Sequence, residues 1–286
     1  MTKYLRDIGL IMTLLFALSC TEEEPQILPE ISLDQPKSIS AVRAVMTSRL
    51  KRDGTGGVTR RGITYSIHRN PDLDDSVQED QRFYGAFDYK LFDLLPNTTY
   101  YVRAFAQNSV GLTFSNELEI TTEAEANYSI LDTGPGGGII FMDMGNYENG
   151  WRYMEALPLD NPNHNNVFWF DHQYIPIGTF PGIGKGEINS YKFNIQTRAI
   201  NQLSSMQVLA NMSSNGYKDW FLPSIEELAE VREKLYLTNL GGFEDDVYWS
   251  STEKDDLKSI IMYFSTGLTF YEYKAFANKV IAVRLF

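Results

Sequence analysis

The side chains that could do chemistry are few in this chain of 286 residues. Cys20 is the only cysteine, so no disulfide can form within the chain and any thiol mechanism must use that one side chain. The histidines are His68, His164 and His172, and no HExxH motif or carboxylate cluster with the spacing of zinc ligands accompanies them. We therefore expect no catalytic residue, no bound metal and no cofactor.

Acidic residues and one glycine-rich segment are weaker candidates. The pairs Asp245-Asp246 and Asp255-Asp256 could attract Ca²⁺, but they lack the alternating oxygen spacing of a calcium-binding loop, which favours solvated loop charge. A glycosidase needs two carboxylates about 5 to 10 Å apart, a separation that the sequence neither supports nor excludes. The segment from Gly178 to Gly186 lacks a following GK[ST] motif and is interpreted as a structured loop. A carbohydrate-active enzyme stays a less favoured alternative.

The charge balance restricts the partners. The chain has 25 basic and 37 acidic side chains and a formal net charge of -12. Such a charge opposes binding to nucleic acid and to anionic membrane surfaces. We expect a neutral or cationic partner and no nucleic acid.

The N-terminus explains the single cysteine. Lys3 and Arg6 precede an apolar stretch, Ile8 to Leu18, that is too short to span a bilayer and ends close to Cys20. The pattern resembles a bacterial lipoprotein signal peptide, although the residues just before the cysteine depart from the commonest lipobox. The resemblance implies that residues 1–19 are removed and that Cys20 becomes the acylated N-terminus, so the membrane is contacted through lipid alone. An ordinary secretory signal is the alternative.

Residues 20–30 are predicted to form an acidic tether, since they contain Pro25 and Pro29. Thr21 to Glu24 resembles the acidic export signal that directs some Gram-negative lipoproteins to the outer face of the outer membrane. The resemblance implies a lipid-anchored, surface-exposed outer-membrane protein. A plain solvated linker is the alternative interpretation.

Residues 31–123 carry short β-like runs bounded by turn residues, with alternation through Ile63, Tyr65 and Ile67. The stretch from Leu94 to Ala104 reads Leu-Leu-Pro-Asn-Thr-Thr-Tyr-Tyr-Val-Arg-Ala and resembles the tyrosine corner of fibronectin type III domains. The resemblance implies an all-β sandwich in which Tyr100 is fixed against the upstream backbone. Sandwiches of this kind commonly serve as spacers.

Residues 127–286 are predicted to form a separate α+β domain. Helical spacing of apolar residues predicts one helix from Phe193 to Ala210. Ser224 and Glu227 form a capping-box pattern that predicts the start of a second helix, whose buried stripe contains Leu228, Val231 and Leu235. Beyond Gly241-Gly242 the chain is expected to be β-like to its end.

Several motifs occur in fixed order in this second domain. They are Gly134 to Phe141 with Gly150-Trp151, Asn215 to Ser224 with Glu227-Leu228, Tyr248 to Glu253, Phe264 to Gly267, and Val283-Arg284. Together they resemble the C-type-lectin-like domains of bacterial collagen-like adhesins and surface lipoproteins. We interpret six of the motif residues as structural: Asp219, Trp220, Pro223, Glu227, Trp249 and Arg284. The large tryptophan rings are expected in the core, and Asp219 and Arg284 are expected either to pair with each other or to hydrogen-bond the backbone inside it. A ligand-binding role for these residues is the alternative.

The last hairpin also resembles the variable proteins that diversity-generating retroelements diversify. Lys274 matches a recurring lysine of that group. The resemblance implies that a set of ligand-contacting side chains is displayed here: Lys254, Asp255, Asp256, Ile261, Tyr263, Thr266, Leu268, Phe270, Tyr271 and Tyr273. Tyrosine gives contact area at a low cost in side-chain entropy, which suits such a surface. A strand buried on both faces is the alternative.

The sequence thus predicts a cell-surface lipoprotein that is not an enzyme and binds a protein or glycan ligand through its C-terminal domain. Formylglycine-generating oxidases share the broad fold but depend on cysteine chemistry, for which Cys20 is unsuited if it carries lipid. A structural subunit of a surface assembly is the main alternative.

Overall fold

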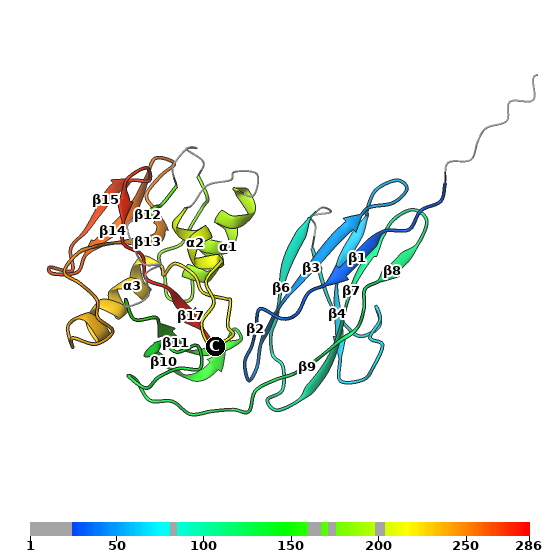
Figure 1. Cartoon of the computed structure of the whole chain (residues 1–286), viewed down its shortest axis with the longest axis horizontal. Coiled ribbons are helices and arrows are strands. Elements are labelled where there is room, and N and C mark those ends of the chain that lie inside the picture. The colour runs from blue at the N-terminus through cyan, green and yellow to red at the C-terminus, as the bar shows by residue number, and fades with distance from the viewer. Residues whose placement is uncertain (1–24, 81–84, 160–166, 171–175, 198–203) are drawn as a thin grey trace, which may run out of the picture.

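The computed structural model describes residues 25–80, 85–159, 167–170, 176–197 and 204–286. Cys20, the signal segment and the first part of the predicted tether lie outside the described residues, as do His164 and His172. In the part of the chain that is described, no helix is long and apolar enough to cross a bilayer. The described chain is mostly β and forms two lobes (Figure 1).

The N-terminal lobe is a sandwich of two antiparallel sheets. One sheet has the order β1-β3-β2, with β6 also paired to β3, and the other has the order β5-β4-β7-β8, with β9 also paired to β7. Their bounds are β1 Glu30–Leu33, β2 Ser38–Ile39, β3 Ala44–Arg52, β4 Arg60–Ser66, β5 Ser76–Asp80, β6 Ala86–Leu91, β7 Thr99–Gln107, β8 Leu112–Phe114 and β9 Leu118–Thr121. Alternate residues of both sheets, such as Met46, Ile63 and Val102, fill the space between them.

The tyrosine corner is present at the start of β7. The hydroxyl of Tyr100 accepts a hydrogen bond from the backbone N–H of Leu95 at 3.0 Å, and the ring is buried against the core. A Tyr at this place fixes the chain as it enters the strand. The corner and the two-sheet topology support the prediction of a fibronectin type III-like sandwich.

Residues 25–29, predicted as tether, lie against this sandwich. The backbone N–H of Ile27 donates to Thr55 Oγ1 at 3.0 Å, and its carbonyl accepts from Thr55 N at 2.9 Å. Asn108 Nδ2 donates to the same carbonyl at 2.8 Å. Any free tether must therefore end before these residues.

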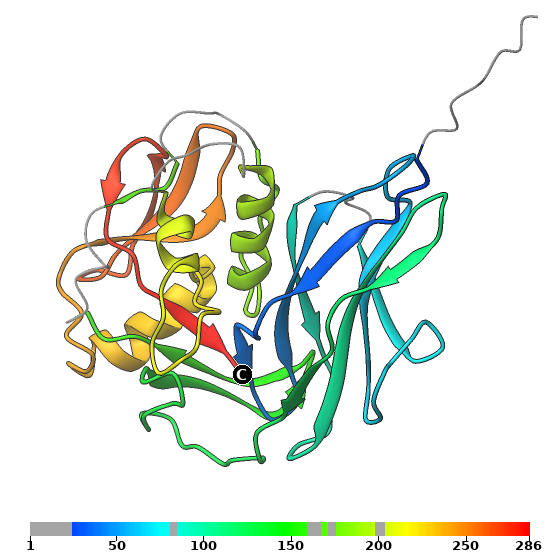
Figure 2. The same cartoon turned by 45° about the vertical axis from the view of Figure 1, so that its right-hand side comes forward.

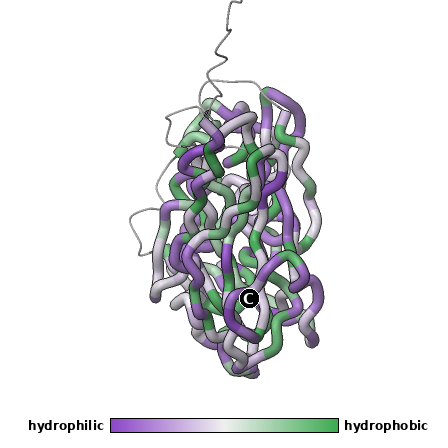
Figure 3. The backbone as a smooth tube through the Cα atoms, turned by 90° about the vertical axis from the view of Figure 1, so that its right-hand side faces the viewer, coloured by the Kyte–Doolittle hydropathy of each residue, from purple (hydrophilic) through white to green (hydrophobic). Residues whose placement is uncertain are grey.

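The C-terminal lobe has two main antiparallel sheets and short helices, and it is α+β as predicted. The sheets are β10-β11-β17 and β13-β14-β15, and β12 pairs with β16. The strand bounds are β10 Ile139–Glu148, β11 Trp151–Ala156, β12 Val167–Phe168, β13 Val247–Glu253, β14 Lys258–Tyr263, β15 Thr269–Tyr273, β16 Ala277–Asn278 and β17 Val283–Leu285. Hydrophobic and hydrophilic residues are interspersed along the backbone (Figure 3). The finer prediction of a C-type-lectin-like fold stays a prediction.

The prediction of one helix from Phe193 to Ala210 is wrong. The structure has α1 at Gly186–Gln196 and α2 at Ser205–Ala210. Ser204 has an extended backbone and caps α2 in a capping box with Gln207, so no helix can run through it. The spacing of apolar residues continued across two helices because both bury a face against the same core cluster.

The second predicted helix is confirmed. Ser224 and Glu227 form the capping box at the start of α3, Ile225–Val231, and a π-helical segment, η2 Arg232–Tyr236, continues it. Leu228, Val231 and Leu235 are fully buried. They pack under both main sheets in one cluster.

The two lobes pack directly on each other, with α1 standing beside the sandwich (Figure 2). The ring of Tyr191 on α1 lies edge-on to Phe87 of β6 at a centroid distance of 5.8 Å. Gly150 has a φ of +78°, and a Cβ added there would collide with the ring of Phe92. The junction is therefore a packed interface.

Candidate functional site

The β14–β15 hairpin lies at one side of the C-terminal lobe. β14 pairs with β13 on one side and with β15 on the other, and among the described residues β15 has no second neighbour. The register places Ile261 opposite Phe270 and Lys258 opposite Tyr273. β15 is therefore an edge strand among the described residues. It carries three of the predicted ligand-contacting residues, Phe270, Tyr271 and Tyr273, and the others lie on β14 or in the turns before and after β14.

The structure divides the predicted contact residues into two groups. Most of them are solvent-exposed: Lys254, Asp255, Asp256, Tyr263, Thr266, Leu268, Phe270, Tyr271 and Tyr273. Ile261 is 2% exposed and packs in the cluster that contains Trp249, so its prediction as a contact residue is wrong. Alternation did not distinguish a buried from an exposed face, because β14 is a central strand that is buried on both faces. Met262 packs in one core cluster and Ile261 in another.

One face of β15 presents two tyrosines beside two lysines. Tyr271 and Tyr273 are 56% and 47% exposed. The ammonium nitrogen of Lys254 lies 5.0 Å from the ring centroid of Tyr271, and that of Lys258 lies 4.5 Å from the ring centroid of Tyr273. Such cation–π contacts attract each ammonium group to the face of its ring.

The opposite face of β15 carries apolar side chains at its start, followed by Glu272. The rings of Phe270 and Tyr263 meet edge to face at a centroid distance of 5.4 Å and an interplanar angle of 80°. Leu268, at the turn, is 57% exposed. Both faces of one short strand thus expose large apolar side chains.

A buried ion pair supports the hairpin from behind. Lys274 directly follows β15, and its Nζ lies 2.5 Å from Glu253 Oε1 and 4.5 Å from the ring centroid of Trp169. Burial lowers the pKa of Lys274, and Glu253 opposes this shift. The sequence marked Lys274 as a recurring lysine but gave no sign of its partner, because the pair is formed across the sheet.

The loop before α1 is held by carboxylates. Glu253 accepts from the backbone N–H groups of Ile177 and Gly178, at 3.0 and 2.9 Å. Glu227 accepts from Gly186 N at 3.2 Å and from Ser224 N at 2.8 Å. Burial raises the pKa of Glu227 to about 7, although these backbone donors oppose the shift. The glycine-rich segment is thus a structured loop fixed by two acids.

The remaining motif residues form the interior. Trp220 and Trp249 are buried, and Pro223 contributes a buried carbonyl that accepts from Ser251 N at 2.7 Å. Arg284 Nε donates to Asp219 Oδ1 and its Nη1 donates to Glu155 Oε1, both at 2.8 Å. Contacts of this kind hold the fold together.

Glu155 was not identified from the sequence. Its carboxylate accepts from Gly136 N at 2.9 Å and Gly138 N at 2.8 Å, and a Cβ at Gly134 would collide with it. Burial raises the pKa of Glu155, and Arg284 opposes the shift. The run of glycines at 134–138 was the available signal, since a backbone that approaches a buried side chain this closely excludes Cβ atoms.

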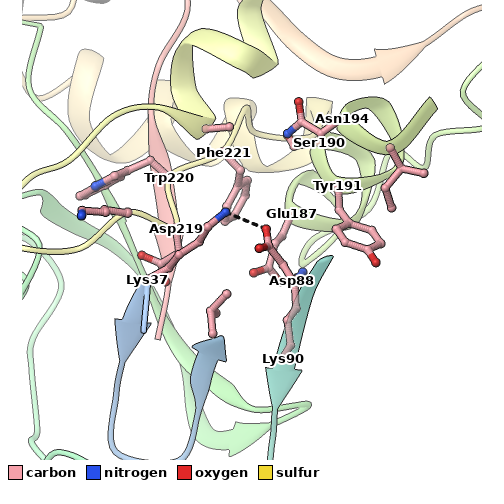
Figure 4. Close-up of a pocket in the computed structure, with 14 residues that line it drawn as sticks. Lys37, Asp88, Lys90, Glu187, Ser190, Tyr191, Asn194, Asp219, Trp220 and Phe221 are labelled. Atoms are coloured by element: carbon pink, nitrogen blue, oxygen red, sulfur yellow. Dashed lines mark hydrogen bonds and ion pairs between the residues drawn. The ribbon is translucent and has the colours of Figure 1, made fainter. Parts of the chain in front are cut away.

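A small cavity of about 100 Å³ lies between the two lobes (Figure 4). Lys37 and Asp88 pair across it at 2.7 Å, and Lys90 pairs with Glu187 at 2.9 Å. These pairs leave little charge for a ligand, and the volume is well below the 300 Å³ or more that is typical of ligand pockets. The cavity therefore belongs to the interface.

The described residues hold no group of three or more His, Cys, Asp or Glu side chains that could bind a metal ion. Of the paired acids, Asp255 accepts through Oδ1 from the backbone N–H groups of Leu257 and Lys258. This carboxylate orders the turn between β13 and β14.

No protein-family model matches the chain, and no curated protein matches it. Solved structures resemble about a third of it. A sensor domain of the anti-sigma factor RsgI4 of Pseudobacteroides cellulosolvens has 18% identity and a TM-score of 0.26, covering 34% of this chain and 96% of its own. The fibronectin type III domain of human fibronectin type III domain containing protein 3 has 13% identity and a TM-score of 0.27, covering 36% and 94%. The FN1–FN3 domains of chicken CNTN1 have 21% identity and a TM-score of 0.26, covering 35% and 33%. The likeness concerns the sandwich fold alone.

Proposed function

We propose that this protein is a cell-surface lipoprotein whose C-terminal domain, of C-type-lectin-like fold, binds a protein or glycan ligand through the β14–β15 hairpin. The observation that carries the proposal is the exposure of large apolar side chains on both faces of β15. Tyr263, Phe270, Tyr271 and Tyr273 are each 41% to 56% exposed. Exposed aromatic groups gathered on one element are typical of binding surfaces, since each offers a large contact area with few rotatable bonds.

The rigidity of the hairpin favours binding over a structural role. Its aromatic rings stand on a strand whose end is tied to the core by Lys274 and Glu253. A contact surface that is already ordered loses little entropy when it binds. A structural subunit of a surface assembly is the alternative, because a partner subunit could cover the same aromatic side chains.

The location at the cell surface is proposed from the N-terminal motif. Acylation of Cys20 would anchor the chain to the outer membrane through lipid only, and the sandwich would act as the spacer. Metabolic labelling with a palmitate analogue tests this. We expect label on the wild type and none on Cys20→Ala, and label retained by Cys20→Ala would contradict the anchor.

The ligand can be sought with the soluble chain from Thr21 to Phe286 on a glycan array and in pulldowns from surface-protein extracts. Both lobes are kept because Tyr191 and Glu187 of α1 pack on the sandwich. We expect that Tyr271→Ser combined with Tyr273→Ser weakens binding at least tenfold without lowering the unfolding temperature by more than a few degrees.

Ile67→Ser is the matched control, since Ile67 is a 64% exposed apolar side chain at the end of β4. It should leave binding unchanged. Ligand binding that survives the double tyrosine change would sink the assignment of this face. Turnover of a captured glycan by the wild type would support the enzyme alternative instead.

A further inference from the structure

The outer edge of β15 has backbone hydrogen-bonding groups with no partner in the part of the chain that the structure describes. Tyr263 N donates to Leu268 O and Lys274 N donates to Leu257 O, both at 3.0 Å, so residues 268 and 274 face β14. Alternation along an antiparallel strand then points the N–H and C=O groups of Thr269 and Tyr271 away from the sheet. Among the described residues none bonds to these four groups.

The next outward residue is already satisfied. Tyr273 N donates to Glu272 Oε1 at 2.8 Å, and Tyr273 O accepts from Phe276 N at 2.9 Å. The free part of the edge is therefore short and centred on Thr269 and Tyr271.

This edge has few of the features that keep sheet edges from pairing. Natural proteins protect edge strands with proline, lysine, bulges or a covering segment. β15 reads Thr-Phe-Tyr-Glu-Tyr, pairs with β14 without a register shift, and is solvent-exposed over most of its length. Only Glu272 places a charge on it.

We propose that β15 binds its partner by strand addition: an extended segment of another protein pairs with the free edge at Thr269 and Tyr271. The proposal rests on the proposed function, which makes this hairpin the binding site. Backbone hydrogen bonds would supply register, and alternate side chains of the added strand would contact the two faces of β15.

The lysines define the chemistry of that partner. Among the described residues no carboxylate oxygen lies within 4.0 Å of the ammonium nitrogen of Lys254 or Lys258. Two nearby carboxylates are engaged with backbone N–H groups, Asp255 with Lys258 N and Glu272 with Tyr273 N. Asp256 is solvent-exposed in the turn between β13 and β14. An added strand with carboxylates on the tyrosine face and apolar side chains on the Phe270 face is complementary to both. This local charge differs from the net charge of -12, which by itself favours a neutral or cationic partner.

A second copy of this chain fits the edge less well. Antiparallel pairing of β15 with itself would bring the lysines of the two copies onto one face, where like charges repel. A foreign strand is therefore the favoured occupant.

The test uses the soluble chain from Thr21 and two fluorescent eight-residue peptides, one alternating Glu with Val and one alternating Lys with Val, with blocked ends. Fluorescence anisotropy should show saturable binding of the Glu-Val peptide and at least tenfold weaker binding of the Lys-Val peptide. Lys254→Glu combined with Lys258→Glu should reverse the preference. Absence of saturable binding by both peptides would overturn the proposal.

Thr269→Pro tests the backbone. Proline removes the outward N–H and leaves every aromatic ring and the bonds to β14 in place. We expect at least tenfold weaker binding of the Glu-Val peptide, whereas Thr269→Val, which keeps the N–H, should bind within twofold of wild type. Hydrogen exchange on the wild type provides a check that needs no variant: the amides of Thr269 and Tyr271 should slow at least tenfold on peptide binding.

The two proposals fail in different ways. A captured ligand that is lost with the tyrosine changes but kept by Thr269→Pro would leave the hairpin as a binding site and overturn strand addition. Peptide binding that survives both the tyrosine changes and Thr269→Pro would contradict both. A dimer in sedimentation that Thr269→Pro dissociates would replace the foreign strand with a second copy.

Discussion

Arg284 and Glu155 form an ion pair inside the C-terminal lobe, with Arg284 Nη1 donating to Glu155 Oε1 at 2.8 Å and both side chains at most 1% exposed. The pair joins the last strand, β17, to β11, its neighbour in the sheet. Asp219 accepts from the same guanidinium, so one cation satisfies two buried acids. This arrangement connects the two ends of the domain.

Replacing Arg284 should lower the free energy of unfolding. Arg284→Met leaves Glu155 and Asp219 buried without their partner, and breaking a buried pair costs about 3 to 5 kcal/mol of unfolding free energy. Urea unfolding followed by tryptophan fluorescence measures the loss. Arg60→Met is the control, because Arg60 pairs with Glu79 at the exposed surface of the sandwich and should lose less than about 1 kcal/mol. Equal losses in the two variants would contradict the role given to Arg284.

Glu227 should make stability fall as the pH rises toward neutrality. Its pKa is raised to about 7 by burial, so the folded chain keeps the proton that an unfolded chain releases near pH 4.5. Stability from this group is complete below about pH 4.5 and is lost as the pH rises through 7, by about 3 kcal/mol in total. Unfolding of wild type and Glu227→Gln between pH 4.5 and 7.5 checks this: the wild type should lose stability relative to the variant. Parallel pH profiles would refute it.

One carboxylate joins the two lobes through ion pairs. Glu187 of α1 accepts from Arg43 and Lys90 of the sandwich. Burial raises the pKa of Glu187, but the charges of Arg43 and Lys90 outweigh this effect and lower the pKa to about 2. The stability that the ionised carboxylate contributes is therefore present above about pH 4.5 and is lost as the pH falls toward 2. Glu187→Gln should cost about 2 to 3 kcal/mol, less than a fully buried pair.

That loss should appear at the junction. We expect the wild type to unfold in one thermal transition and Glu187→Gln to unfold in two, with a larger radius of gyration for the variant in X-ray scattering. Glu226→Gln, at an exposed position on α3, should change neither property. A single transition and unchanged scattering in Glu187→Gln would show that apolar packing alone holds the lobes together.

The tyrosine corner should stabilise the sandwich. Tyr100→Phe removes the hydroxyl that accepts from Leu95 N and leaves this donor unsatisfied, at a cost of about 1 to 3 kcal/mol. The adjacent Tyr101→Phe should cost less than about 0.5 kcal/mol, since its ring is only partly buried and lies under the guanidinium of Arg69. Chemical unfolding compares the two, and similar costs would contradict the corner's role.

The sequence by itself determined the features whose partners lie a few residues apart. The capping box of Ser224 and Glu227 and the hydrogen bond from Leu95 N to Tyr100 are local, and short motifs report them. The burial of Trp220 and Trp249 could also be predicted, since large rings in a chain without disulfides must fill the core.

Only the tertiary structure decided which surfaces are covered. Ile261 and Phe270 lie opposite each other in the register, yet the first is buried and the second exposed, because the core covers β14 and ends before β15. The ion-pair partners of Glu155, Glu187 and Lys274 likewise lie on elements that are not adjacent to them along the chain. The hydrophobic periodicity and composition of a segment indicate which secondary structure it favours. Whether both faces of a strand are buried, and which ion pairs form across a sheet, depends on elements that meet only in the folded chain.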